Sequence, residues 1–140
     1  MPVPYLACMA LGAALNHLPA QVLPAIHHVE GGKVGTVSRN KNGSEDLGVM
    51  QVNTLWIPSL AAGTGLDPEK VRHELINNAC FNIVIAGVIL RNYLAETNGD
   101  MAKAVGNYHS HTPLLNATYQ LQVARAAVDQ ALASAAPAVK

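Results

Sequence analysis

The segment from Asn77 to Glu96 limits the possible folds more than any other part of this sequence. Its apolar side chains cover nearly the whole circumference of a helix: Phe81, Ile83, Val84, Ile85, Val88, Ile89, Leu90 and Leu94. Such a helix is typical of a core element that other helices surround. Its longest apolar run, from residue 83 to 90, is far below the roughly 18 residues that suggest a membrane span. We therefore predict a mainly α-helical fold around this helix, without a transmembrane segment.

Length and charge narrow the class further. A chain of 140 residues has the size of one domain, and we predict a single domain over residues 1–140. Nine basic residues balance nine acidic ones, which argues against a nucleic-acid surface or a polybasic membrane patch. The apolar N-terminal run lacks the basic region of a secretory signal, so we interpret it as the first helix.

The stretch around Glu30 predicts a helix followed by a polar loop. Pro19 suits the first turn of a helix that runs to about Glu30, where Gly31 and Gly32 can supply a left-handed cap. Residues 31–47 have no periodic pattern and predict a loop, with a short β-hairpin around Asn42-Gly43.

Other helices are predicted from residues that begin and end helices. These signals give a short helix capped by Asn53 or Thr54 and running through Leu60, one opened by Asp67-Pro68-Glu69, one from the turn at 97–100 to about Tyr108, and a last one from Thr112-Pro113 to about Ser134. We expect the C-terminal tail, about 135–140, to fray.

Glu30 is the residue whose chemistry calls for an explanation. It shares an otherwise apolar helical face with Leu23 and Ile26. Partial burial and the negative end of the helix dipole would both disfavour its charged form and raise its pKa. A carboxylic acid that keeps its proton near neutral pH can donate it to a leaving oxygen, as glycosidic bond cleavage requires. The alternative is that Glu30 only bonds a backbone amide or an arginine.

Three stretches together carry a resemblance to a known family: "VEGG…VSRNKNGSEDLGVMQVNTLW", "AVGNYHSHTP" and "ATYQLQVARA". With them, nearly the whole chain resembles the lytic transglycosylases of the lysozyme superfamily, particularly the small soluble type that accompanies bacterial secretion and pilus systems. The resemblance implies a lysozyme-like helical domain that cleaves the β-1,4 bond between N-acetylmuramic acid and N-acetylglucosamine in peptidoglycan. It implies a 1,6-anhydromuramoyl product, no cofactor and no metal.

The resemblance also assigns roles to residues. Glu30 matches the single catalytic acid/base of the family. Gln51 and Asn53 carry amides that suit acetamido groups and sugar hydroxyls, and Met50 could supply an apolar wall against a sugar ring. Asn53 also suits a helix cap. The remaining candidates for the substrate groove are Ser38, which matches a family serine that contacts the acid, Tyr108, whose hydroxyl could reach Glu30 or the substrate, and Tyr119, which could support the same wall or belong to the core.

Asp46 raises an alternative within the same superfamily. The segment from Arg39 to Asn53 also resembles animal-type lysozymes, in which a second carboxylate precedes the glycine. A second carboxylate would allow a muramidase that hydrolyses the same bond. The other interpretation is that Asp46 orders the loop through hydrogen bonds and lies in the substrate groove.

Two further alternatives come from other functional classes. One is a non-catalytic peptidoglycan-binding module that keeps the fold and groove. The other is a zinc site formed by His27, His28, Glu30, His109 and His111. Adjacent helical histidines point about 100° apart, and the sequence lacks the His-Glu-x-x-His run, so the spacing argues against zinc.

The remaining expectations concern cysteines, tryptophan and context. Cys8 and Cys80 could pair or could be two small buried apolar residues, and only the resemblance favours the disulfide. Trp56, the only tryptophan, could stack on a sugar, although a position one turn into a helix favours packing. We expect a monomer in the periplasm whose partners are glycan strands and components of a secretion or pilus machine, although this chain shows no export signal.

Overall fold

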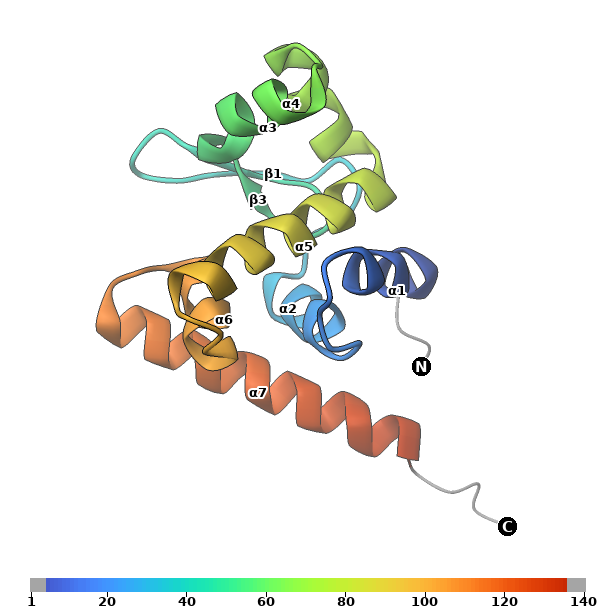
Figure 1. The fold of residues 1–140 in the computed structure, drawn as a ribbon, viewed down its shortest axis with the longest axis vertical. Coiled ribbons are helices and arrows are strands. Elements are labelled where there is room, and N and C mark those ends of the chain that lie inside the picture. Colours follow the sequence, from blue (N-terminus) through green and yellow to red (C-terminus); the bar gives the residue numbers. More distant parts are fainter. Residues whose placement is uncertain (1–4, 136–140) are drawn as a thin grey trace.

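The protein is mainly α-helical, with a small antiparallel sheet (Figure 1). The computed structural model describes residues 5–135. The predicted frayed tail lies outside this range, apart from Ala135, the last residue of α7. The elements, in order, are α1 (Leu6–Leu15), α2 (Val22–Glu30), β1 (Val37–Arg39), β2 (Glu45–Leu47), β3 (Val52–Asn53), η1 (Thr54–Trp56), α3 (Ile57–Thr64), α4 (Pro68–Asn77), α5 (Ala79–Glu96), α6 (Met101–His109) and α7 (Pro113–Ala135).

Helix α5 is the centre of the fold, as the sequence predicts. It packs against α1, α4 and α6 and also contacts α2 and β3. Buried side chains from several of its faces, such as Ile83, Ile85 and Leu90, join one hydrophobic core. Helix α5 is long and apolar enough to cross a membrane. The same length and composition also suit a core helix, and 44% of its residues are buried inside the fold. The absence of a transmembrane segment stays a prediction.

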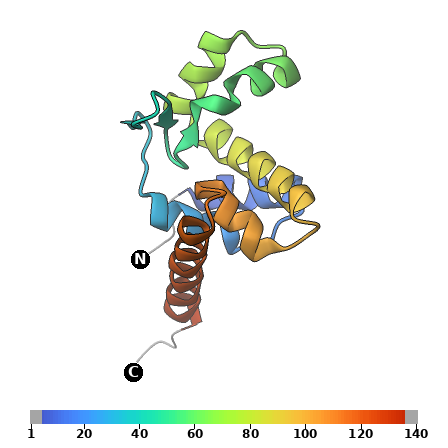
Figure 2. The same ribbon diagram turned by 90° about the vertical axis from the view of Figure 1, so that its left-hand side faces the viewer.

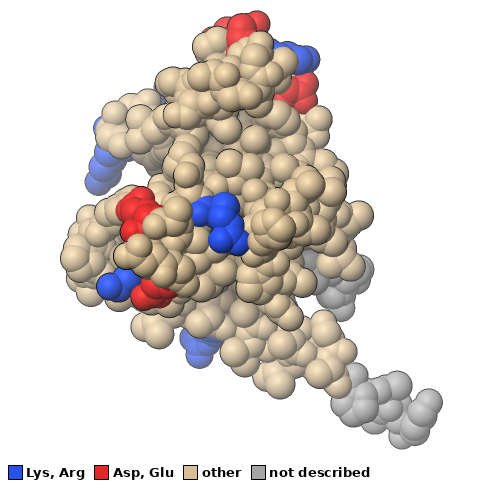
Figure 3. Space-filling view, viewed as in Figure 1, with Lys and Arg blue, Asp and Glu red and all other residues tan. Residues whose placement is uncertain are grey.

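The remaining elements form two lobes on either side of α5 (Figures 1 and 2). The β lobe consists of the sheet, η1, α3 and α4. The helical lobe consists of α1, α2, α6 and α7, in which α7 packs along α2 and α6. On the face drawn in Figure 3, charged side chains are scattered and form no large patch, as the balanced charge leads us to expect.

The sheet is the predicted hairpin with one short strand added. Its order is β1-β2-β3, and both pairs are antiparallel. Asn42 and Gly43 lie in the turn, where the Asn42 side-chain oxygen accepts hydrogen bonds from the backbone and the hydroxyl of Ser44. The register places Asp46 between Ser38 on one side and Asn53 on the other.

Most predicted helix ends are close to the observed ones because they depend on local capping. Asp67 caps α4 by accepting from two backbone amides of its first turn. Two predictions are wrong in detail. Pro19 precedes α2, which begins at Val22, because its carbonyl accepts from the Val22 amide and closes a tighter turn first. Helix α3 continues past Leu60 to Thr64, because Gly65 supplies the left-handed residue that ends it.

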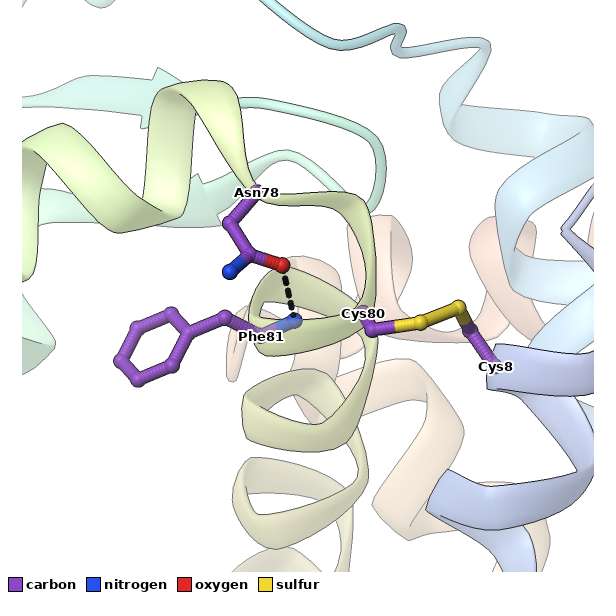
Figure 4. Close-up of a disulfide and its surroundings, with 4 residues drawn as sticks. All are labelled: Cys8, Asn78, Cys80 and Phe81. Atoms are coloured by element: carbon purple, nitrogen blue, oxygen red, sulfur yellow. Dashed lines mark hydrogen bonds between the residues drawn. A yellow bond between two sulfur atoms is a disulfide. The ribbon is translucent and has the colours of Figure 1, made fainter.

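A disulfide between Cys8 and Cys80 joins α1 to the first turn of α5 (Figure 4). The two Cα atoms lie 5.0 Å apart. Beside it, the side chain of Asn78 caps α5 by accepting from the Phe81 amide at 3.0 Å. A link across 72 residues of sequence restricts the unfolded chain strongly, by about 4 kcal/mol in the chain-entropy model.

Candidate active site

Glu30 is the last residue of α2, and the backbone after it explains why the helix stops there. Gly31 takes a left-handed conformation, with φ of 68°, and its amide donates to the His27 carbonyl. Gly32 then passes so close to the Gly48 carbonyl that an added Cβ would lie 2.2 Å from its oxygen. The second glycine of the Glu-Gly-Gly run therefore lets the end of α2 meet the segment that follows β2.

That segment, residues 48–53, is held in place by a fully buried amide that the sequence analysis missed. Asn82 of α5 accepts a hydrogen bond from the Met50 amide and donates to the carbonyls of Leu47 and Leu75, all three at 2.8 Å. Gly48 has φ of 69°, and a side chain there would collide with the Leu75 carbonyl. Asn82 thus fixes the segment to the central helix, 32 residues away from Met50 in sequence.

A small pocket of about 80 Å³ lies between the two lobes and contains Glu30. Its lining comes from α2, the sheet, η1, α5 and α6: Glu30, Asp46, Gln51, Val52, Asn53, Trp56, Ile89, Tyr108 and His109. Ligand pockets usually measure about 300–1,000 Å³. A pocket this small admits part of a ligand, such as one substituent or a bridging atom, while the rest of the ligand lies outside it.

Burial dominates the electrostatics of Glu30. Removal from water raises the pKa of Glu30 to about 7, the hydrogen bond from Tyr119 lowers it, and the negative charge of Asp46 raises it. Tyr119 donates to Glu30 Oε2 at 2.6 Å, and no residue within 5–135 donates to Oε1. At neutral pH, a large share of the Glu30 carboxyl groups therefore carry a proton, which suits a general acid.

The tyrosine that bonds Glu30 is Tyr119, not Tyr108. The Tyr108 hydroxyl donates to the Met50 carbonyl at 2.8 Å, so the predicted contact with Glu30 is wrong. Tyr108 lines the pocket, and its contact with the substrate stays a prediction. Tyr119 is only 3% exposed, so it belongs to the core and lies behind the pocket, where it contacts Glu30 and His109. Burial, followed by the nearby Glu30 carboxylate, raises the pKa of Tyr119. Its hydroxyl therefore keeps its proton and stays a donor.

Asp46 lies in the same pocket as Glu30, and its carboxylate is partly engaged. Its Oδ1 accepts from Asn53 Nδ2 at 3.0 Å, and no described residue donates to its Oδ2. Asn53 also donates to Ser44 Oγ and caps η1 by accepting from the Leu55 amide. The structure therefore gives Asn53 the capping role that the sequence allowed, with one side chain that also orients Asp46.

Gln51 has the side-chain amide oxygen of this segment that accepts no hydrogen bond from the described residues. Its φ is 54°, in the left-handed region, and its Nε2 donates to the carbonyl of Gly48 at 3.0 Å and more weakly to that of Asp46 at 3.4 Å. Within the described chain, nothing donates to its Oε1. Gln51 lines the pocket, and its oxygen is free to accept a hydrogen bond from a ligand.

Two predicted site residues lie elsewhere. Met50 is 0% exposed, so the prediction that it forms an apolar wall against a sugar is wrong: its side chain belongs to the core. Ser38 does not line the pocket. It lies on β1 opposite Asp46, and no hydrogen bond to Glu30 is found among the described residues, because the hairpin holds it one strand farther out.

His109 and Trp56 both line the pocket. The sequence analysis considered Trp56 for sugar stacking or packing, and His109 only for a zinc site. The exposed His109 ring stacks on Tyr119, with ring centroids 5.0 Å apart and planes inclined by 11°. Trp56 is half-buried and packs edge to face against Tyr93. The packing predicted for Trp56 is therefore present, together with an exposed part in the pocket. The place of His109 in the pocket depends on its contact with Tyr119 of α7, which the sequence pattern does not contain.

The histidines considered for zinc are used in other ways. His27 Nε2 bonds the Gly32 carbonyl at 3.0 Å, and His111 Nε2 bonds Glu96 Oε1. Within residues 5–135, no three His, Cys, Asp or Glu side chains gather closely enough to hold a metal ion.

Comparison with known proteins gives one set of relatives. The chain is similar to the invasion protein IagB of Salmonella typhimurium, strains SL1344 and LT2, and of Salmonella typhi. Each is 28% identical over 106 residues, which cover 75% of this chain and 62% of the relative. The chain therefore spans less than two thirds of the length of these relatives. No protein-family model matches the sequence.

Proposed function

We propose that this protein is a peptidoglycan lytic transglycosylase in which Glu30 is the only acid/base. The observation that carries the proposal is the partly buried Glu30 carboxyl in the pocket between the lobes, with its pKa raised to about 7. At neutral pH a large share of the Glu30 carboxyl groups with this pKa carry a proton, so Glu30 can donate it in the first step and, as a carboxylate, take a proton back in the second. The choice of peptidoglycan as the substrate rests on the resemblance of the segments around Glu30, Gly48–Asn53 and Tyr108 to lytic transglycosylases.

The reaction needs one proton donated and one proton taken back. Glu30 Oε1 gives its proton to the oxygen that links N-acetylmuramic acid to N-acetylglucosamine, while the bond from this oxygen to C1 of the muramic acid residue breaks. None of the described residues donates a hydrogen bond to Oε1. The substrate's own N-acetyl group stabilises the cationic sugar. The resulting Glu30 carboxylate then takes the proton of the C6 hydroxyl of the same muramic acid residue. The C6 oxygen bonds to C1 and closes the 1,6-anhydro ring. Glu30 ends protonated, and no water is consumed.

Tyr119 and Gln51 would assist this cycle. The Tyr119 hydroxyl, 2.6 Å from Glu30 Oε2, stabilises the ionised form of Glu30 more than the protonated form and orients the carboxyl, so that Oε1 is the oxygen left for chemistry. The free oxygen of Gln51 can accept from an acetamido N–H or a sugar hydroxyl.

A second candidate is lysozyme-type hydrolysis with Asp46 as the second carboxylate. One observation favours it: Asp46 lines the same pocket, and its charge raises the pKa of Glu30. However, Asp46 Oδ1 also accepts a hydrogen bond from Asn53, which equally suits a carboxylate that only orders the β2–β3 region. We therefore keep transglycosylation as the main proposal and let the product decide.

The deciding experiment is digestion of purified peptidoglycan sacculi, with mass spectrometry of the soluble fragments. We expect 1,6-anhydro ends from the wild type. Glu30→Gln should lose about 10²–10⁴-fold in rate while still sedimenting with sacculi, and Asp46→Asn should keep the anhydro product. Asp129→Asn, on the exposed face of α7, is the matched control.

Other products would support the alternatives. Reducing ends that disappear with Asp46→Asn would establish hydrolysis. Binding to sacculi without cleavage by the wild type would indicate a non-catalytic module.

The cellular setting is also a proposal. A peptidoglycan substrate places the reaction in the bacterial periplasm. The similarity to proteins named for invasion, together with the resemblance to the small type that accompanies secretion and pilus systems, supports local wall opening for such a machine.

A further inference from the structure

Helix α7 carries an exposed apolar strip along its whole length. On the face turned away from the core, an apolar residue recurs at every third or fourth position: Leu114, Ala117, Leu121, Ala124, Val128, Ala131 and Ala135. This is the spacing of the a and d positions of a coiled-coil heptad, which pack against a second helix. All of these residues are exposed, and Leu114 and Leu121 are exposed by 76% and 72%.

The strip continues into an apolar groove on one side of α7. The groove, of about 350 Å³, lies between α7 and the first turns of α2 and α6. Leu121 and Ala124 belong to both the strip and the groove, and Val22 and Met101 line the opposite wall. No charged side chain of the described residues lines the groove. Monomeric proteins rarely expose continuous apolar surface of more than a few hundred Å², so this face is expected to have a partner.

The C-terminal part of α7 extends beyond the rest of the helical lobe (Figures 1 and 2). After Ala126, no residue of α7 up to Ala135 is buried. Val128 and Leu132 in this part are 56% and 65% exposed. Because most helical stability in proteins comes from packing of one face, this part of α7 would gain stability from a second helix.

The charges beside the strip suit a second copy of the same helix. Arg125 and Asp129 are the only charged residues of α7, and neither forms an ion pair within residues 5–135. If two α7 helices run antiparallel and cross near residues 126–127, Arg125 of each lies close to Asp129 of the other. Parallel helices in register would bring like charges to the same level, where they repel. Charge therefore favours an antiparallel pair.

The same arrangement sets large residues against small ones. Leu121 lies opposite Ala131 of the partner subunit, and Val128 lies opposite Ala124 of the partner subunit. Alternation of large and small side chains across two helices lets them interdigitate. The apolar pattern and the charges of α7 therefore agree on one register.

We propose that this face of α7 is a homodimer interface, in which two antiparallel α7 helices pair and cover the groove beside α2 and α6. With 23 residues, α7 is about 34 Å long and about 10 Å wide. Together with the groove, such a face approaches the roughly 600 Å² per partner that small specific interfaces bury. We therefore expect a dimer with a dissociation constant of about 1–100 µM, in place of the monomer expected from the sequence.

The dimer leaves the Glu30 pocket intact. Tyr119, which bonds Glu30, lies on the buried face of α7, opposite the strip. Dimer formation therefore needs neither a substrate nor the chemistry of Glu30, and it can be tested on the protein alone.

Sedimentation equilibrium of the full chain tests the interface. Between about 1 µM and about 1 mM, a range that brackets the expected affinity, the mass should rise from one chain toward two. Leu121→Glu and Val128→Glu each place a charge in the centre of the interface and should weaken the dimer at least tenfold, by a rough estimate. Leu55→Glu, at a residue of η1 that is 73% exposed, is the matched control and should dimerise like the wild type. Melting temperatures report on folding.

A charge exchange tests the antiparallel register. Arg125→Asp replaces attraction by repulsion at both ends of the pair and should weaken the dimer by about 5- to 10-fold at low salt. Arg125→Asp combined with Asp129→Arg restores opposite charges across the interface and should recover most of the affinity. An effect of Arg125→Asp that the second substitution does not reverse would contradict the register.

Three results would overturn the interface. The wild type could stay monomeric over the whole concentration range. A dimer could form that neither Leu121→Glu nor Val128→Glu weakens, which would place the contact on another surface. Finally, a monomer that sediments with phosphatidylglycerol vesicles, and loses this binding with Leu121→Glu, would show that the face binds a lipid surface and not a second copy.

Discussion

The hydroxyl of Tyr119 donates a hydrogen bond of 2.6 Å to the carboxyl of Glu30, although 89 residues separate them in sequence. The contact exists because α7 packs along α2. It opposes the effect of burial on the pKa of Glu30. This balance sets the pH at which Glu30 exchanges its proton.

Tyr119→Phe should move the activity profile toward higher pH. The variant keeps the ring but loses the hydrogen bond that lowers the pKa of Glu30, so Glu30 should stay protonated to a higher pH. We expect the alkaline limb of kcat/KM to shift upward by about one pH unit, the size of one hydrogen bond to a charged group. Tyr108→Phe, whose hydroxyl bonds the Met50 carbonyl, is the comparison. A limb that stays in place would separate Tyr119 from the chemistry.

Glu30→Gln should make the fold more stable at neutral pH. The folded state holds the Glu30 proton up to about pH 7, whereas an unperturbed carboxyl loses it near 4.5. Wild-type stability therefore falls as the pH rises from about 4.5 to 7 and stays level above, because the unfolded state releases its proton first. Glu30→Gln does not lose stability in this way, so above pH 7 its free energy of unfolding should exceed that of the wild type by up to about 3 kcal/mol.

Urea unfolding at pH 4 and pH 8 measures this difference. Glu69→Gln, at an exposed position of α4, should follow the wild type at both values. An equal effect of Glu30→Gln at pH 4 and pH 8 would mean that the pKa of Glu30 is not raised by folding.

Gly32→Ala should destabilise the protein by about 2 kcal/mol or more, because the added methyl meets the backbone of Gly48 and Val49 and one of the two segments must shift. The shift would also move Glu30, so activity should fall with stability. Gly63→Ala is the control, because its Cβ has open space in α3 and alanine favours the helix by up to about 1 kcal/mol. Similar melting temperatures for both variants would contradict the close approach.

Asn82→Leu should cost at least about 3 kcal/mol of unfolding free energy. The leucine side chain is similar in size but cannot form hydrogen bonds, so the Met50 amide and the carbonyls of Leu47 and Leu75 lose their partner. Each unpaired buried group costs about 1–3 kcal/mol. Asn77→Ala removes an exposed amide at the end of α4 and should cost less than about 1 kcal/mol. Equal unfolding midpoints for the two variants would show that Asn82 does not anchor the segment.

Much of the fold could be predicted because the signals are local. Asp67 and Asn53 cap their helices through atoms only two or three residues away, and Gly31 closes α2 at the next position. The central place of α5 follows from apolar residues on all its faces, which also predicts that other helices surround it. The hairpin follows from a turn of Asn42 and Gly43.

The site was harder to predict because its contacts join distant segments. Whether Tyr108 or Tyr119 reaches Glu30 depends on how α6 and α7 lie against α2, which the sequence pattern does not contain. Met50 alternates with polar residues, as a half-exposed segment would, yet it turns into the core because Asn82 binds its amide. His109 lines the pocket and stacks on Tyr119 of α7, a contact that depends on how α6 and α7 pack.

The most direct test of the account is an NMR titration of the Glu30 carboxyl carbon, with Glu30→Gln used to assign its signal. The account predicts a midpoint near pH 7, so that a large share of the molecules carry the proton at neutral pH. A midpoint near 4.5 would mean that Glu30 is fully ionised there, and it would contradict the account of Glu30 as the acid of this protein.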